Sequence, residues 1–185
     1  MISVKADFGF KSPAFDPNSR IFNPKLGAGA LLDIGIYPIF LAQILLGRPD
    51  KILAAATFTE LGVDESCAMT FVYPDKKLAM LHCSTAMLTA TEAYIYGKKG
   101  TIYLQTRFHH PTKLTLSRYR GTAQESEEIA LDYDGHGYGY EIKHVMDCLE
   151  KGLVESPLLP LDFSLNLTEL LDWVQEEIKK GDISE

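Results

Sequence analysis

The run Gly27-Ala28-Gly29-Ala30-Leu31-Leu32-Asp33-Ile34-Gly35-Ile36-Tyr37 is an apolar segment that carries one carboxylate and one phenol. In a helix, Asp33 and Tyr37 would lie four residues apart on the same face. A charge and a hydroxyl in a buried element cost free energy unless they are hydrogen-bonded. Because tyrosine can exchange a proton that a carboxylate helps to orient, the pair is a candidate for acid–base chemistry. The alternative is a carboxylate that caps the helix start beside a core tyrosine.

The segments next to this run show two different periodicities. Apolar and polar residues alternate from Ile2 to Phe10, which indicates a half-buried strand, and Lys11 to Leu26 has the composition of a loop. A helix that is apolar on almost every side is expected from Ala30 to Leu46. Pro38 should kink this helix or mark a restart, because proline lacks the backbone N–H.

Strands are expected next, and helices at the end of the chain. Two helices are expected, one around residues 142–149 and one after Pro160. Short turns between the strands indicate hairpins, and hairpins imply a mainly antiparallel sheet. Helices before and after such a run of strands predict the α+β class. The expected strands cover residues 52–58, 69–73, 78–84, 93–96, 101–104, 113–117 and 127–131.

The opening run resembles the signature at the start of the C-terminal domain in the glucose-fructose oxidoreductase / inositol dehydrogenase (Gfo/Idh/MocA) family. Most members carry a histidine at the position of Tyr37, and the tyrosine is similar to a dihydrodiol dehydrogenase-like branch. Five further segments match in the same order, so the resemblance covers nearly the whole chain. They are Ala6–Phe10, Gly62–Glu65, Ile95–Gly100, Gly137–Ile142 and Glu155–Pro157.

This resemblance implies roles for four residues. Tyr37 would be the catalytic proton-transfer residue, and Asp33 its hydrogen-bonding neighbour. Gly35 would lie near the nicotinamide end of the cofactor, where a glycine lets the backbone approach closely, although a packing role is an equal alternative. Arg20 in the preceding loop would contact the substrate or a cofactor phosphate, since guanidinium suits oxygen-rich partners, although a solvated surface position is the more common one.

The resemblance also implies a second half. Family members begin with a Rossmann domain whose phosphate-binding turn reads Gly-x-Gly-x-x-Gly, and this sequence contains no such turn after a strand. Residues 1–185 are therefore expected to form a single substrate-binding and dimerisation domain, an open sheet with helices on one face. NADP or NAD would be bound mainly by the missing domain, so this chain alone should lack efficient catalysis.

The implied partners are small molecules and a second copy of the chain. The substrate would be a sugar, polyol or trans-dihydrodiol, and the open sheet face would form a homodimer interface. A second hypothesis remains open, namely a non-catalytic dimerisation or ligand-binding module derived from the family. Replacing Tyr37 with phenylalanine in a two-domain protein would separate the two hypotheses.

Composition excludes several other classes. A net charge of −7 is opposite to the basic face of nucleic-acid binders and to what anionic membranes attract. The three scattered cysteines indicate free thiols in a reducing cytoplasm. The N-terminus has no apolar core of signal-peptide type, and the apolar run up to Leu46 contains Asp33, Pro38 and Gln43, which favours a buried helix over a membrane span.

Other polar residues have simpler explanations. No metal site is expected, because no Cys-x-x-Cys pair occurs and His109-His110 lacks a nearby third ligand, which favours a surface loop. His136 lies in a glycine-rich lead into a helix, and His144 is expected to pair with Glu141 on one helix face. Asp64-Glu65 could be paired acids or part of a turn before a strand.

Overall fold

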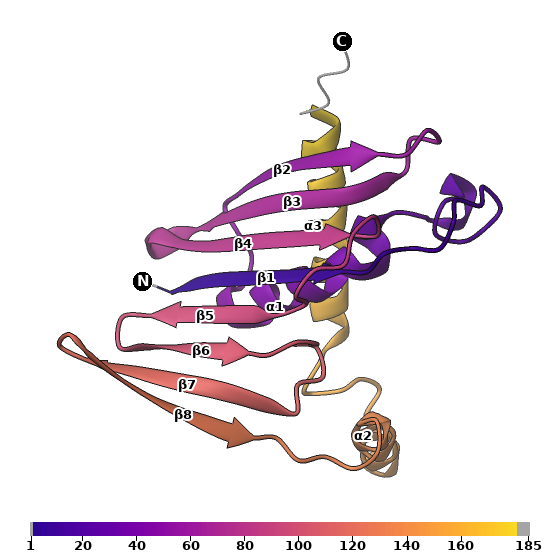
Figure 1. The fold of residues 1–185 in the computed structure, drawn as a ribbon. Helices are drawn as coiled ribbons and strands as arrows, with labels where there is room; N and C mark the ends of the chain where they lie inside the picture. The colour runs from indigo at the N-terminus through magenta and orange to yellow at the C-terminus, as the bar shows by residue number, and fades with distance from the viewer. Residues whose placement is uncertain (1, 181–185) are drawn as a thin grey trace.

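The computed structural model describes residues 2–180 and contains one eight-stranded sheet (Figure 1). The strands lie in the order β2-β3-β4-β1-β5-β6-β7-β8, and three α-helices, α1, α2 and α3, accompany them. The strands are β1 Ser3–Gly9, β2 Lys51–Phe58, β3 Asp64–Tyr73, β4 Lys77–Ser84, β5 Ala93–Gly97, β6 Gly100–Leu104, β7 Lys113–Arg120 and β8 Ala123–Ala130. The helices are α1 Ile36–Leu46, α2 Tyr138–Glu150 and α3 Leu161–Lys180, with short turns at Pro24–Leu26, Leu31–Gly35 and Pro74–Lys76.

The sheet is mainly antiparallel, which confirms the α+β prediction. Neighbouring strands pair antiparallel throughout, except that β1 pairs with β4 in parallel. A parallel pair needs a long crossover, and the chain between β1 and β4 supplies one that includes α1. The first strand is thereby inserted in the middle of the sheet, with β4 on one side and β5 on the other.

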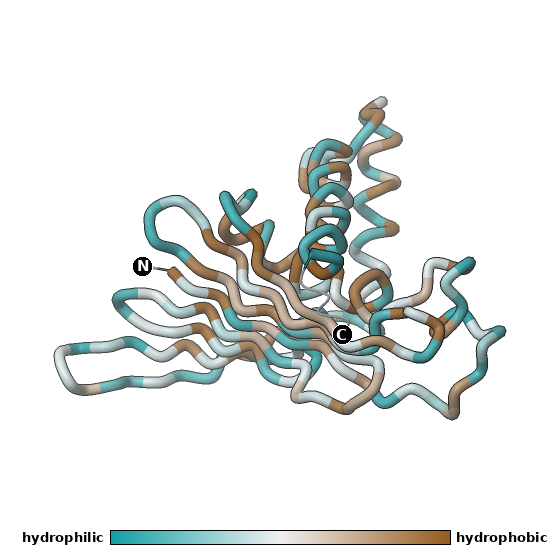
Figure 2. Tube along the Cα trace, turned by 90° about the horizontal axis from the view of Figure 1, so that it is seen from above, coloured by the Kyte–Doolittle hydropathy of each residue, from teal (hydrophilic) through white to brown (hydrophobic). Residues whose placement is uncertain are grey.

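The core lies between the central strands and helices α1 and α3. Alternate residues of β1, such as Val4 and Ala6, are fully buried, as the alternating pattern predicted. Phe71 of β3 and Leu170 of α3 are also inaccessible to solvent. Figure 2 shows the helices standing on one side of the sheet, while hydrophobic residues line the central strands. The other face of the sheet is open.

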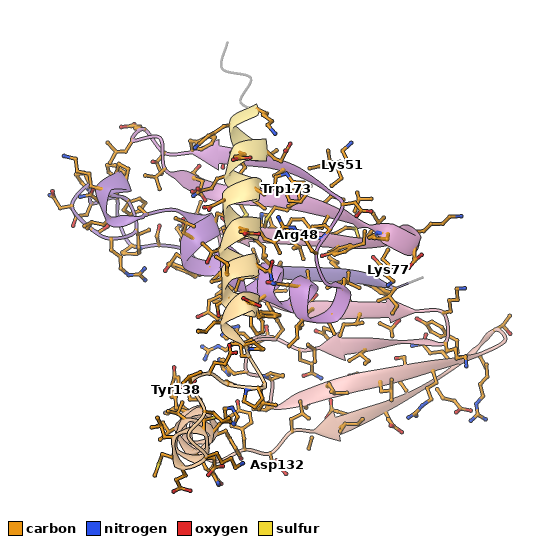
Figure 3. The ribbon with its side chains drawn as sticks, turned by 180° about the vertical axis from the view of Figure 1, so that it is seen from behind. Arg48, Lys51, Lys77, Asp132, Tyr138 and Trp173 are labelled. Carbon is orange, nitrogen blue, oxygen red and sulfur yellow. The ribbon has the colours of Figure 1, made fainter. Side chains whose placement is uncertain are left out.

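Helix α3 runs across the strands, and Arg48 contacts it at Glu169 and Trp173 (Figure 3). Arg48 Nη1 lies 2.6 Å from Glu169 Oε2, and its guanidinium lies 5.9 Å from the centre of the Trp173 ring. Both groups are about half exposed, so these contacts orient the helix more than they stabilise it. The buried stripe of α3 supplies most of the stabilisation through apolar contacts with β2 and α1.

The expected helix Ala30–Leu46 forms in two parts. A π-helical turn covers Leu31–Gly35, and α1 starts at Ile36. Pro38 is the third residue of α1, so its missing N–H removes one backbone hydrogen bond exactly where the wide turn passes into the regular helix. The change of helix type therefore lies at Ile36, two residues before the predicted restart at Pro38.

The segment Pro24–Leu46 is long and apolar enough to span a membrane by length and composition alone. Half of its apolar window is buried inside the structure, and α1 packs on β1 and β4. Its eleven-residue α-helix is shorter than the roughly 20 residues that a bilayer core requires. The packing thus favours a core helix.

Helix α2 stands beside the sheet rather than on it, next to the outer strand β8 (Figure 1). The predicted helix is present, but its apolar stripe faces outward. Ile142, Val145, Met146 and Leu149 are each more than half exposed. Only Cys148 of this helix is buried among the described residues.

Candidate active site

Tyr37 lies in the first turn of α1, beside the end of β1. Its ring centre is 5.2 Å from that of Phe8 and 5.1 Å from that of His109. The residue is 41% exposed, whereas the next two residues of α1, Pro38 and Ile39, are buried. A core tyrosine would be covered, so this position favours a phenol that meets a ligand over the packing alternative.

Asp33 pairs with Arg20, a contact that the sequence did not reveal. Asp33 Oδ1 accepts a hydrogen bond from Arg20 Nη1 at 2.6 Å, and the side chains are 18% and 70% exposed, respectively. The hydrogen bond and the charge of Asp33 raise the pKa of Arg20. Within residues 2–180 no hydrogen bond joins Asp33 to Tyr37. Two of the four predicted site residues therefore form an ion pair one helical turn before the phenol.

Gly35 is buried under the sheet, where a side chain would not fit. A Cβ atom there would lie 2.9 Å from Cys83 Sγ and 3.2 Å from Leu31 Cδ1. Close packing of the π-turn on β4 therefore explains the glycine, one of the two roles that the sequence left open. Contact between Gly35 and a cofactor stays a prediction.

The start of the site helix is capped from a distant strand. Asp64, the first residue of β3, accepts a hydrogen bond from the Leu31 N–H at 2.7 Å through Oδ2. A Cβ atom on Gly29 would collide with Asp64 Oδ1, and Gly29 has a φ of +131°, which favours glycine. Burial raises the pKa of Asp64, against hydrogen bonds from the helix backbone that lower it. Asp64 is therefore a cap and not half of an acid pair.

His109 and His110 lie in a loop after β6, as predicted, and His109 is partly buried and lines the cavity beside Tyr37. It follows β6 and stacks on Phe8 with ring centres 4.8 Å apart and an interplanar angle of 9°. Burial, together with nearby His110 and Arg107, lowers its pKa to about 4. The imidazole is consequently neutral at pH 7. Sequence reasoning missed it because residues 8, 37 and 109 come together only through the sheet order.

A cavity of about 500 Å³ adjoins the phenol and the imidazole. Apart from these two groups, the lining is apolar and comes from α1, α3 and the loop after β6. The lining residues are Ile36, Tyr37, Phe40, Leu41, Phe108, His109 and Leu167. An apolar pocket with few polar groups is the common form of a small-molecule site.

Two further histidines serve other purposes. His144 Nε2 lies 2.8 Å from Ser156 Oγ, so the expected pairing with Glu141 on the helix face was wrong, and the contact instead ties α2 to the following loop. His110 is exposed, and its backbone N–H donates to the Arg107 carbonyl. Within the described part of the chain, no group of three or more potential metal ligands occurs.

Comparison with known proteins shows the family to which this chain belongs. Residues 1–103 match the model of the GFO/IDH/MocA C-terminal domain. The chain belongs to the GFO/IDH/MocA family. Trans-1,2-dihydrobenzene-1,2-diol dehydrogenase from Homo sapiens is 34% identical over 185 residues, which cover 96% of this chain and 52% of that protein. The enzyme of the same name from Xenopus tropicalis is 31% identical and is matched over 95% of this chain and 53% of its own length.

Two solved structures share the fold of this chain. Aldose-aldose oxidoreductase from Caulobacter crescentus superimposes with a TM-score of 0.79 at 19% identity, covering 97% of this chain and 53% of that one. UDP-N-acetylglucosamine 3-dehydrogenase from Acidithiobacillus ferrooxidans gives 0.78 at 13% identity, over 96% and 54%. The chain spans about half the length of the curated relatives it matches.

Proposed function

We propose that this chain is the substrate-side half of an NAD(P)-dependent oxidoreductase that acts on a hydroxyl of a sugar, polyol or trans-dihydrodiol. The observation that carries the proposal is the exposed phenol of Tyr37 at an apolar cavity, held on a rigid helix beside the Arg20–Asp33 ion pair. The dehydrogenases of dihydrobenzenediol that share about a third of its sequence support it.

In this proposal Tyr37 accepts the proton of the substrate hydroxyl during oxidation and returns it during reduction. When bound, NADP or NAD would accept the hydride from the carbon that bears this hydroxyl. The apolar lining limits water around the reacting carbon, and the packing of α1 on β1 and β4 fixes the phenol in place. Asp33 orients Arg20, whose exposed guanidinium can hold an oxygen of the substrate or of a cofactor phosphate.

Of the candidate site residues, only Arg20 suits a phosphate of NADP or NAD, because it is an exposed cation. Gly35 lies under β4, where a Cβ atom would lie 2.9 Å from Cys83 Sγ. Gly29 of the opening run lies against Asp64, whose carboxylate would repel a phosphate. We therefore infer that a separate Rossmann domain holds most of the cofactor and that the chain alone does not turn over substrate.

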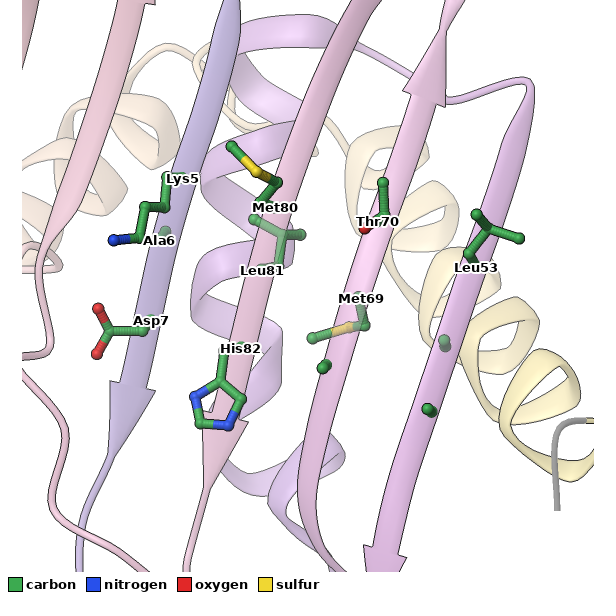
Figure 4. A pocket seen from close by; sticks show the side chains of 12 residues that line it. Lys5, Ala6, Asp7, Leu53, Met69, Thr70, Met80, Leu81 and His82 are labelled. Carbon is green, nitrogen blue, oxygen red and sulfur yellow. The ribbon is translucent and has the colours of Figure 1, made fainter. Parts of the chain in front are cut away.

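The open face of the sheet is the surface that we propose for a homodimer (Figure 4). Leu53 and Met80 are 50% and 44% exposed on neighbouring parts of this face, next to the polar groups Lys5, Asp7 and His82. A mixed surface of this kind suits a self-association interface. The net charge of −7 and three free cysteines support a cytoplasmic protein without nucleic-acid or membrane partners.

Replacing Tyr37 with phenylalanine in the two-domain protein tests the proposal. We expect kcat for oxidation of trans-1,2-dihydrobenzene-1,2-diol with NADP to fall by roughly 10²- to 10⁴-fold, because the proton acceptor is lost. Melting temperature should hardly change, since the hydroxyl has no hydrogen-bond partner within the described residues. The matched control is Tyr138→Phe, an exposed tyrosine on α2. Turnover that survives Tyr37→Phe would leave a binding or dimerisation module as the better account.

A further inference from the structure

We propose that His109 is a substrate-binding residue of the Tyr37 site, where its Nε2–H donates a hydrogen bond to the second oxygen of a vicinal diol while Tyr37 meets the first. This inference rests on the proposed function and extends it, because it selects which diols the cavity accepts. It arises from three features: a fixed imidazole, a single accessible ring nitrogen, and an otherwise apolar lining.

The imidazole is held in place from several directions. It stacks on Phe8, and it lies edge-on to its neighbour Phe108, with ring centres 5.8 Å apart. Phe108 is buried, and its N–H donates to the Thr91 carbonyl at 3.1 Å. On the far side of the loop, the Tyr133 hydroxyl donates to the carbonyl of His110 at 2.9 Å. The loop after β6 therefore presents a pre-positioned ring, which reduces the entropy lost on binding.

The two ring nitrogens have different surroundings. Nδ1 is buried without a hydrogen-bond partner among the described residues, whereas Nε2 is the nitrogen that remains accessible. A buried N–H donor without a hydrogen-bond partner costs more free energy than a buried ring-nitrogen acceptor without one. The favoured neutral tautomer therefore carries its proton on Nε2. His109 presents a donor, and a donor suits both a hydroxyl oxygen and the carbonyl oxygen that forms from it.

The remaining lining defines the class of substrate. Five apolar side chains surround the phenol and the imidazole, so the cavity offers two polar groups on one side and hydrocarbon on the others. A ring with two adjacent hydroxyls on one edge and an apolar opposite edge matches this distribution. A ring that is hydroxylated all round would leave hydroxyls buried without partners, which costs free energy. The site should therefore prefer carbocyclic vicinal diols to fully hydroxylated polyols.

The alternative is that His109 only fills space beside Phe8. Phenylalanine can replace the stacking surface but not the hydrogen bond, while asparagine can replace the hydrogen bond but not the stacking. The variants His109→Phe and His109→Asn separate these contributions. His110→Phe is the matched control, because it makes the same change in the adjacent, exposed residue.

The experiment titrates trans-cyclohexane-1,2-diol, and separately myo-inositol, into the chain labelled for NMR. The readouts are the ring resonances of Tyr37 and the imidazole nitrogens of His109. We expect saturable shifts of both groups with the cyclohexanediol and weaker binding of myo-inositol. His109→Phe should weaken diol binding by roughly tenfold, His109→Asn should recover part of it, and His110→Phe should have no effect.

The outcomes distinguish this inference from the proposed function. If the diol shifts Tyr37 and His109→Phe binds it as tightly as the unchanged chain, His109 only packs and the inference is overturned while the Tyr37 site stands. If His110→Phe weakens binding as much as His109→Phe, loop structure and not the imidazole is responsible, and the inference again fails. If the diol shifts neither ring, both the inference and the diol site at Tyr37 are refuted.

Discussion

The two halves of the sheet differ in what covers them. The inner half, strands β2, β3, β4 and β1, carries α1 and α3 on one face and contains nearly all of the buried core. The outer half, β5 to β8, has no helix packed closely on it, and every residue of β8 is exposed. Core burial sets stability, so the inner half should dominate the free energy of unfolding.

The candidate site lies where these halves meet. Tyr37, Asp33 and Arg20 come from the inner half, and His109 arrives on a loop that follows β6 in the outer half. The stable half thus fixes the phenol, and the less covered half supplies the ring beside it. We therefore expect that substitutions in the outer half can change the site without greatly changing the free energy of unfolding.

The largest expected effect is in the inner core. Phe71→Ala removes a side chain with no exposed surface and should lower the free energy of unfolding by about 3–5 kcal/mol. Urea unfolding followed by circular dichroism measures the loss. The counterpart in the outer half is Leu116→Ala, a partly buried residue of β7, which should cost only about 1 kcal/mol. If both substitutions lowered the free energy of unfolding equally, the inner half would not dominate stability.

A smaller effect is expected at Asp64, the residue of the inner half that caps the Leu31–Gly35 turn leading into α1. Asp64→Ala should destabilise the protein by about 1–2 kcal/mol, because the Leu31 N–H at the helix start loses its acceptor. Asp64→Asn retains an oxygen acceptor and serves as the control, with a loss below about 1 kcal/mol. Thermal unfolding of both variants measures this difference. If the alanine and asparagine variants are equally stable, the carboxylate is not the cap.

His109, which lies where the two halves of the sheet meet, should make the free energy of unfolding depend on pH. The pKa of His109 is lowered from 6.5 to about 4 in the folded chain, so the unfolded chain binds a proton there that the native chain does not. Stability should therefore fall as the pH drops from about 6.5 towards 4, and His109→Phe should flatten this part of the curve. His110 and Arg107, which also face the imidazole, remain in that variant.

Urea midpoints measured across this pH range test the prediction, with His110→Phe as the comparison variant. That control removes the neighbouring imidazole of His110 but keeps the partly buried ring of His109, so it should preserve most of the slope. A His109→Phe variant with an unchanged slope would show that the imidazole is not protected from protonation by the fold.

The smallest effect is expected in the outer hairpin. Arg118 and Glu127 pair across β7 and β8 with both side chains half exposed, and the pair lowers the pKa of Glu127. Arg118→Ala should lower stability only slightly, and high salt should remove most of that loss. Thermal melts at low and high salt measure it. A loss as large as that of Phe71→Ala would show that the outer half is more tightly coupled than its exposure indicates.

Local patterns predicted most elements because their causes are local. The alternation from Ile2 to Phe10 gives β1, the turn residues after Tyr73 and Tyr96 give hairpins, and the apolar spacing after Pro160 gives α3. Each of these depends on which face of a short segment is apolar, and neighbouring residues report that directly. The placement of α2 beside the sheet could not be predicted, because its apolar stripe resembles that of a helix packed on a core.

The site was predictable only in part. The opening run, by its resemblance to a family, marked Tyr37, Asp33 and Gly35, and the loop before it marked Arg20. The Arg20–Asp33 pair, the capping of Leu31 by Asp64 and the stacking of His109 on Phe8 join residues 13, 33 and 101 positions apart. No short pattern connects such residues, because strand order and register bring them together.

The sequence by itself determined the α+β class, the positions of the strands and helices, and a phenol and carboxylate in one apolar run. Periodicity and composition act over a few residues, and they suffice for these features. Only the tertiary structure decided that Asp33 binds Arg20, that Gly35 packs on Cys83 and that a neutral histidine faces Tyr37. These contacts depend on the insertion of β1 between β4 and β5, and distant pairings of that kind are settled by burial of the whole core.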